Sequence, residues 1–304
     1  MDGKSLTREL RLILNEASDS SYMDNRLSYE LLWQAAIEFV DRTNCLAATQ
    51  SITTVASQTG YTLNADFIKL YLRNRDNNFY IKYNDGSADT FILHKDKQDV
   101  IYQNSTEATT VPSYFYIDDD ATLNSQISST ASAAGAKTGG QCTLTDSSSS
   151  TRFANVSAGD IVHNTTDGSS GYVISKTSNT ALVTALFDGT DNDWSLADAY
   201  VIQPQGRLRL VLSPPPSTAS HTATVYYIQR PSPVFADYGV YRFSLQHLRA
   251  ILHYAAWLYK YRDRDPNFGD KFFQHFDSSV RKGAVQLNNT MNRQGFGVSF
   301  KRRS

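Results

Sequence analysis

An interruption in the strand pattern limits the possible folds of this 304-residue chain more than any other property. Alternating apolar and polar residues, the period of a β-strand, occupy much of residues 50–117 and return at Arg207. Between them, residues 125–152 are almost entirely Ser, Thr, Ala and Gly, a composition that buries little apolar surface. We therefore expect Tyr114–Ile117 and Arg207–Leu212 to be neighbouring strands of one sheet, separated in sequence by an inserted domain.

We assign the inserted domain to residues 121–206. Four strand-like pieces separated by Gly, Asn and Asp turns follow the Ser/Thr-rich stretch, which predicts a small all-β, barrel-like domain. The domain is acidic, because seven Asp and no Glu stand against Lys137, Arg152 and Lys176. Since the whole chain has a formal net charge of -1, the remainder is slightly basic.

Helical periodicity is confined to the two ends of the chain. Apolar residues recur at spacings of three and four within residues 6–14, and a second helix is predicted for residues 28–41 with Ser28 as its N-cap. Near the other end, Ser244 caps a predicted helix that Asp265-Pro266 breaks, and another helix follows over residues 267–287.

These patterns predict an α+β protein. Residues 1–120 and 207–287 would form a helical body, made by the N- and C-terminal helices, with an antiparallel β-region; the small all-β domain is inserted at 121–206. In the β-region, the turn Asn84-Asp85-Gly86-Ser87 predicts a hairpin. Residues 288–304 show no period and are expected to form an extended, basic C-terminal tail.

Composition and charge exclude several classes of function. Lys plus Arg (29) nearly balances Asp plus Glu (30), which argues against a chain-wide footprint for nucleic acid or a membrane surface. No run approaches the ~18–20 apolar residues of a bilayer span, and the N-terminal residues lack the apolar core of a signal peptide. We expect a soluble protein, made in the cytoplasm, with no membrane partner. Cys45 and Cys142 are too few and too far apart for a disulfide framework or a CxxC zinc site.

No pattern predicts catalysis, a cofactor or a metal site. The motifs GxSxG, GxxxxGK[ST] and GxGxxG are missing, and no two histidines are four residues apart. Successive residues of the run Asp118-Asp119-Asp120 point to opposite faces of a strand, so the three carboxylates do not converge. Asp188, Asp191 and Asp193 lack the closing Glu of an EF-hand. We therefore expect no enzyme activity, although a hydrolase or lyase with an unrecognised site stays an alternative.

Aromatic residues are abundant, with 18 Tyr and 15 Phe. Many lie in the predicted C-terminal helix pair, which carries more apolar surface than a two-helix hairpin can bury in itself. We expect an exposed stripe centred on Phe272 and Phe276, with Tyr259 on the preceding helix, to contact another subunit or a partner. The alternative, that the β-sheet of the same subunit covers this stripe, stays open.

The segments on both sides of the insertion resemble the head-to-tail adaptor (connector) proteins of tailed bacteriophages. That family has two short N-terminal helices, consecutive strands of the kind seen here in PSYFYIDD, RLRLVLSPPP and ATVYYIQRPSP, and a final aromatic-rich helical pair. The resemblance covers residues 4–120 and 207–287. The inserted segment departs from it and looks like the small β-barrel modules of phage structural proteins.

The resemblance implies a non-enzymatic viral protein of the virion neck, a head-tail connector assembled in the cytoplasm of the bacterial host. It implies a homo-oligomeric ring, a dodecamer, that is docked under the portal protein and receives tail proteins (nozzle, tube or fibre). DNA would pass through the lumen without sequence-specific binding. We expect Lys301, Arg302 and Arg303 of the tail to bind a neighbouring ring.

The alternative function is that of a tail-hub or fibre-attachment protein whose inserted domain binds a partner or a host glycan. A glycan site needs exposed Trp platforms, and residues 121–206 contain only Trp194.

Overall fold

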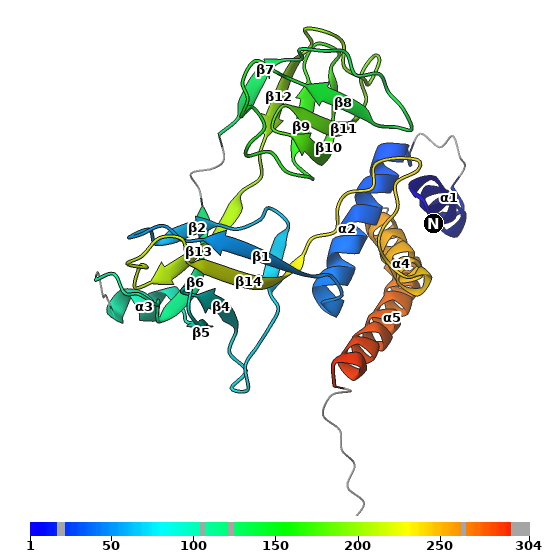
Figure 1. The fold of residues 1–304 in the computed structure, drawn as a ribbon. Coiled ribbons are helices and arrows are strands. Elements are labelled where there is room, and N and C mark those ends of the chain that lie inside the picture. Colours follow the sequence, from blue (N-terminus) through cyan, green and yellow to red (C-terminus); the bar gives the residue numbers. More distant parts are fainter. Residues whose placement is uncertain (17–21, 104–106, 121–124, 263–265, 293–304) are drawn as a thin grey trace, which may run out of the picture. The chain divides into compact units, whose positions relative to one another are not determined.

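The computed structural model describes residues 1–16, 22–103, 107–120, 125–262 and 266–292 (Figure 1). The chain divides into two compact units, and each has its own architecture. The helical unit contains Ser5–Cys45 and the chain from Tyr241 onward. The β-unit contains Leu46–Val240 together with Asp2–Lys4.

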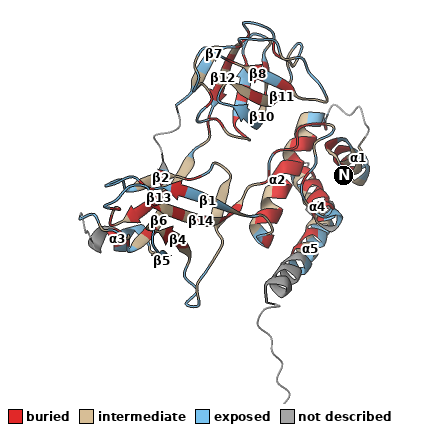
Figure 2. Ribbon diagram, viewed as in Figure 1, coloured by how far each residue is buried: buried red, intermediate tan, exposed pale blue. Residues whose placement is uncertain are grey.

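The helical unit is built around one buried helix. Its helices are α1 (Gly3–Leu14), α2 (Asn25–Thr43), α4 (Leu245–Arg262) and α5 (Pro266–Asn292). α2 packs against both α4 and α5, and α4 also packs along α5. Figure 2 shows α2 buried along most of its length. The buried apolar residues of α2 include Leu31, Leu32, Ala35, Ala36, Phe39 and Val40.

The start of α2 differs from the sequence prediction. Asp24, not Ser28, is the N-cap, and its carboxylate accepts a hydrogen bond from the Leu27 amide at 2.6 Å. Ser28 lies within the first turn and donates its hydroxyl to the Asp24 carbonyl at 2.8 Å. Asp24 offers a charged acceptor to the unpaired amides at the positive end of the helix, so it caps one turn earlier.

The starts of the C-terminal helices agree better with the prediction than the start of α2 does. α4 begins directly after Ser244, whose carbonyl accepts the Leu248 amide at 3.1 Å. α5 begins at Pro266, a residue favoured at the first helical position because it has no amide to leave unpaired. The helix extends to Asn292, beyond the predicted end at Leu287.

The β-unit contains an eight-stranded sheet (Figure 1). Its strand order is β1-β14-β4-β5-β6-β13-β2, with β3 paired to β14, and only β5 and β6 run in parallel among its described pairs. The short helix α3 (Lys97–Gln103) follows β5. The strands are β1 (Ala47–Thr53), β2 (Gly60–Thr62), β3 (Phe67–Leu70), β4 (Tyr80–Asn84), β5 (Asp89–His94), β6 (Tyr114–Asp120), β13 (Arg207–Ser213) and β14 (Thr222–Gln229).

Two local predictions for this sheet are confirmed. β4 and β5 form the expected hairpin, with Asn84 opposite Asp89 and Gly86 at φ 92° in the turn. β6 and β13 pair antiparallel, with Ser213 opposite Tyr114 at one end and Arg207 opposite Asp120 at the other. Strands on the two sides of the insertion are therefore direct neighbours.

All strands of a second, six-stranded sheet lie between β6 and β13 in sequence. The sheet has the order β7-β12-β9-β10-β11-β8, and each neighbouring pair is antiparallel. Its strands are β7 (Ile127–Thr130), β8 (Cys142–Thr145), β9 (Ile161–Asn164), β10 (Ser169–Ser178), β11 (Ala181–Phe187) and β12 (Ala199–Gln203).

Each sheet has a separate hydrophobic core (Figure 2). The core of the eight-stranded sheet includes Ile81, Phe115 and Leu212, which are each 0% exposed. The core of the six-stranded sheet includes Phe153 and Trp194. Neither cluster contains a residue of the other, so each sheet buries its own apolar face. Independent folding of residues 121–206 stays a prediction.

The predicted α+β class, with a helical body and a small inserted domain, is wrong. The structure is mostly β: two curled sheets dominate, and α1, α2, α4 and α5 form a unit apart from the eight-stranded sheet. A long amphipathic helix gives a strong periodic signal in the sequence, whereas each short strand gives a weak one. The sequence therefore underestimates how much of the chain is in the sheets. The second sheet has six strands and its own hydrophobic core, so it is a substantial part of the fold rather than a small inserted domain.

Candidate functional site

Phe276 does not lie on an exposed stripe. Its side chain is 0% exposed, and its ring centroid lies 4.5 Å from that of Tyr254 on α4. The Arg42 guanidinium of α2 lies 5.5 Å from the Phe276 ring, a cation–π distance. The expected exposure of Phe276 is therefore wrong, because α2 and α4 cover this part of α5.

The other predicted interface residues differ in burial. Tyr259 is 9% exposed, and its hydroxyl donates to Glu16 at 3.0 Å. Phe272 is half-buried and stacks on His253, with ring centroids 6.3 Å apart. Burial lowers the pKa of His253, and the charge of nearby His275 lowers it further. An interface role for Tyr259 and Phe272 stays a prediction, and Lys301, Arg302 and Arg303 lie outside the described residues.

The acidic residues singled out in the sequence take part in local contacts. Asp118 accepts hydrogen bonds from Lys97 at 2.9 Å and from Arg209 at 3.2 Å. These contacts, led by the Lys97 hydrogen bond, hold the pKa of Asp118 below its ordinary value. In the part of the chain that the structure describes, no group of three or more His, Cys, Asp or Glu is arranged to hold a metal ion.

A buried amide occupies the centre of the aspartate-rich region in the six-stranded sheet. Asn164 is 0% exposed, and its side-chain nitrogen donates to Asp167, to Asp198 and to the Asp193 carbonyl at 2.9–3.2 Å. Burial and the neighbouring carboxylates raise the pKa of Asp167. The amide nitrogen thus satisfies the acceptors that a cation would otherwise coordinate.

A second polar network in the same sheet centres on the buried carboxylate of Asp146, which pairs with the partly exposed Arg152. The Asp146 carboxylate, 0% exposed, lies 3.1 Å from the Arg152 guanidinium and accepts a 2.6 Å hydrogen bond from the Tyr200 hydroxyl. Burial alone raises the pKa of Asp146, but hydrogen bonds from Ser148 and Tyr200 outweigh it and lower the value to about 2. This network is structural, because each of its groups has a partner within the sheet.

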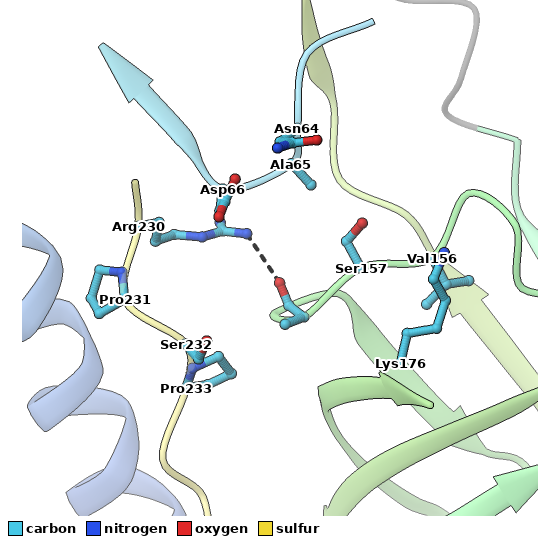
Figure 3. Close-up of a pocket in the computed structure, with 11 residues that line it drawn as sticks. Asn64, Ala65, Asp66, Val156, Ser157, Lys176, Arg230, Pro231, Ser232 and Pro233 are labelled. Atoms are coloured by element: carbon cyan, nitrogen blue, oxygen red, sulfur yellow. Dashed lines mark hydrogen bonds between the residues drawn. The ribbon is translucent and has the colours of Figure 1, made fainter. Parts of the chain in front are cut away.

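A pocket of about 280 Å³ lies in the β-unit, between loops of its two sheets (Figure 3). Arg230, which follows β14, donates to the Ala158 carbonyl at 3.1 Å and to the Gln205 side chain at 2.8 Å. Lys176 donates to the Ala154 carbonyl at 2.9 Å. Burial lowers the pKa of both cations. Arg230 thus links the chain after β14 to residues of the inserted segment, whereas Lys176 bonds within that segment.

A further candidate site is the outer face of the eight-stranded sheet. Residues that point away from the core on β14, β4, β5 and β6 form a continuous row, because Tyr80 lies opposite Leu93 and Leu93 beside Tyr114. Ring centroids of Tyr80 lie 5.1 Å from Phe91 and 6.3 Å from Tyr226. We call this set the outer aromatic row: Tyr80, Phe91, Leu93, Tyr114 and Tyr226.

Basic side chains border the outer aromatic row. The Lys95 ammonium lies 3.6 Å from the centre of the Tyr114 ring, and Lys82 is on the same face as Tyr80, two residues along β4. Lys82 also pairs with Asp89 across the hairpin at 2.8 Å. Strand alternation places these residues on the opposite face from Ile81 and Ile92, but it does not tell which face is buried, so the sequence alone did not reveal the row.

The six-stranded sheet presents a contrasting surface, the acidic loop Asp188–Asp198. This segment contains four Asp and no Lys or Arg, and it exposes Leu196 by 69%. Its base is fixed by Trp194, which is 1% exposed and donates its indole N–H to the Thr184 hydroxyl at 2.9 Å. Because Trp194 is buried, it does not provide the sugar-stacking platform that the glycan-binding alternative requires.

No protein-family model and no curated protein matches this sequence. Among the helices of the described segments, none combines the length and the apolar character needed to cross a membrane.

Proposed function

We propose that this chain is a structural protein of a bacteriophage virion, a head-to-tail adaptor that forms a ring beneath the portal protein. The ring joins the capsid to tail proteins (nozzle, tube or fibre) and surrounds the path of the exiting DNA. Twelve copies are proposed on the strength of the family resemblance. The protein works in the neck of the virion, without enzyme activity.

The observation that carries the proposal is the direct pairing of β6 with β13. The resemblance treats the segments around Tyr114–Ile117 and Leu208–Pro216 as consecutive strands, and the two strands are hydrogen-bonded neighbours from Asp120 and Arg207 onward. The two segments that the resemblance treats as consecutive are therefore neighbours in space, which supports the proposal. The helical unit adds support, because segments from both parts of the chain that flank the sheets pack together there.

The test is assembly with the portal protein of the phage that encodes this chain. Mass photometry of the purified protein, alone and mixed with portal rings, is expected to give a species of about twelve copies and a portal complex with one such ring. Electron microscopy would place the ring at the end of the portal that faces the tail. A chain that stays monomeric and does not bind portal rings would contradict the proposal.

A further inference from the structure

We propose that neighbouring copies of this chain associate by docking the acidic loop of one subunit onto the outer aromatic row of the next. The inference deepens the proposed ring function and rests on it, because it names the two surfaces that join the subunits. The committed occupant of the aromatic row is thus a second copy of the same chain.

The first argument is the exposure of the row. Phe91 is 61% exposed although its strand neighbour Ile92 is 1% exposed in the core, and the other members of the row are half-buried, so the sheet presents part of each of these apolar side chains on the face opposite its core. Antiparallel sheets with one open face usually carry polar residues there. A cluster of adjoining aromatic rings on such a face is typical of a protein interaction site.

The second argument is that the acidic loop presents an exposed apolar side chain on a backbone that is already ordered. Leu196, 69% exposed, projects from a segment whose backbone is fixed on both sides. The Gly135 amide donates to the Trp194 carbonyl at 2.7 Å, and the Asp198 carboxylate accepts the Ser195 amide at 2.7 Å. A loop held in this way loses little conformational entropy on binding.

The third argument is charge complementarity. Of the four Asp in the loop, Asp198 is buried and accepts a hydrogen bond from Asn164, so Asp188, Asp191 and Asp193 supply the surface charge. Lys82 and Lys95 flank the aromatic row. On this face Asp89 pairs with Lys82, and Asp118 pairs with Lys97. The aromatic contacts therefore supply most of the affinity, and the charges set the orientation of the two subunits. Both halves of the contact belong to one chain, which is the requirement for a heterologous, ring-forming interface.

The experiment uses one full-length variant for each surface. Phe91→Asp damages the row but keeps the loop, and Leu196→Asp damages the loop but keeps the row. Each variant alone is expected to lose ring assembly, with self-association at least about tenfold weaker, as for an interface hot spot. Mixed together, the two variants retain one intact loop and one intact row, so they are expected to form a dimer that grows no further. Native mass spectrometry measures these species.

Val55→Asp is the matched control, because Val55 is also exposed (51%) in the β-unit but lies outside both surfaces. It is expected to assemble as the wild-type chain does, and circular dichroism verifies that all three variants are folded. Rings that survive Phe91→Asp and Leu196→Asp would overturn the docking inference while leaving the adaptor function intact. Rings that depend on both surfaces but do not bind portal would overturn the adaptor function alone. A wild-type chain that is monomeric even with portal rings would overturn both.

Discussion

Arg209 on β13 donates a 3.2 Å hydrogen bond to Asp118 on β6, although 91 residues of sequence separate them. Lys97, at the start of α3, binds the same carboxylate at 2.9 Å. This contact joins β6 and β13, the two strands between which the six-stranded sheet is inserted in the sequence. The eight-stranded sheet is therefore complete at this position without any group from the inserted segment.

Deleting residues 121–206 is expected to leave a folded protein. A short Gly/Ser linker suffices to join Asp120 to Arg207, because these residues are opposite each other in adjacent antiparallel strands. The eight-stranded core contains no residue of the deleted segment, so cooperative unfolding in calorimetry and a β-type circular dichroism spectrum should remain. The deletion also removes the acidic loop, so the variant should not form rings. A deletion variant that is unfolded would show that the two sheets depend on each other.

The course of the strands was predictable where the sequence carries a local physical signal. The Asn84-Asp85-Gly86-Ser87 turn specifies its own hairpin, and the common strand pattern on both sides of the insertion specifies the β6–β13 pair. The division of the chain was not predictable in this way. Whether the terminal helices pack on the sheet or on one another depends on tertiary contacts, such as that of Arg42 with Phe276, that leave no local signal.

The candidate site was harder to predict than the fold. An aromatic side chain increases strand propensity on either face, so composition alone did not separate Phe91, which is exposed, from Phe115, which is buried. Strand register decides the difference, and register requires the partner strands. The acidic loop was visible as composition, but its buried anchor Trp194 and exposed Leu196 were not.

Asp146→Asn is expected to destabilise the six-stranded sheet by about 2–3 kcal/mol at neutral pH. The estimate follows from a pKa of about 2 for the folded carboxyl against about 3.9 when unfolded. Because the folded pKa is depressed, this stabilisation is fully present above the unfolded pKa and is lost as the pH falls through the folded one. The stability difference between wild type and variant should therefore shrink between about pH 4 and pH 2.

Urea unfolding at a series of pH values measures this difference. Ser147→Ala is the control, because Ser147 is an exposed neighbour whose contacts involve Ser132 rather than the ion pair. A variant whose stability deficit is independent of pH would assign the stabilisation to packing rather than to the ionised carboxyl.

Asn164→Asp is expected to lower the melting temperature markedly. The substitution replaces the amide that donates to Asp167, Asp198 and the Asp193 carbonyl by a further acceptor, which leaves those oxygens unsatisfied and adds negative charge. Calcium ions should raise the melting temperature of this variant, because oxygen ligands then surround the vacated position. The wild-type chain should not respond to calcium, and a wild-type response would contradict the role given to the amide.

Phe276→Ala is expected to reduce the stability of the helical unit by about 3–5 kcal/mol, the usual loss for a buried Phe truncated to Ala. The ring is 0% exposed among Tyr254, Phe273 and Arg42, so truncation removes contacts on three helices and leaves a cavity. Tyr261→Ala is the matched control, since Tyr261 is 66% exposed on α4 and its truncation should change stability by at most about 0.5 kcal/mol. Denaturant unfolding followed by helical circular dichroism compares the two variants. A stable Phe276→Ala monomer that fails only in assembly would return this residue to an interface between subunits.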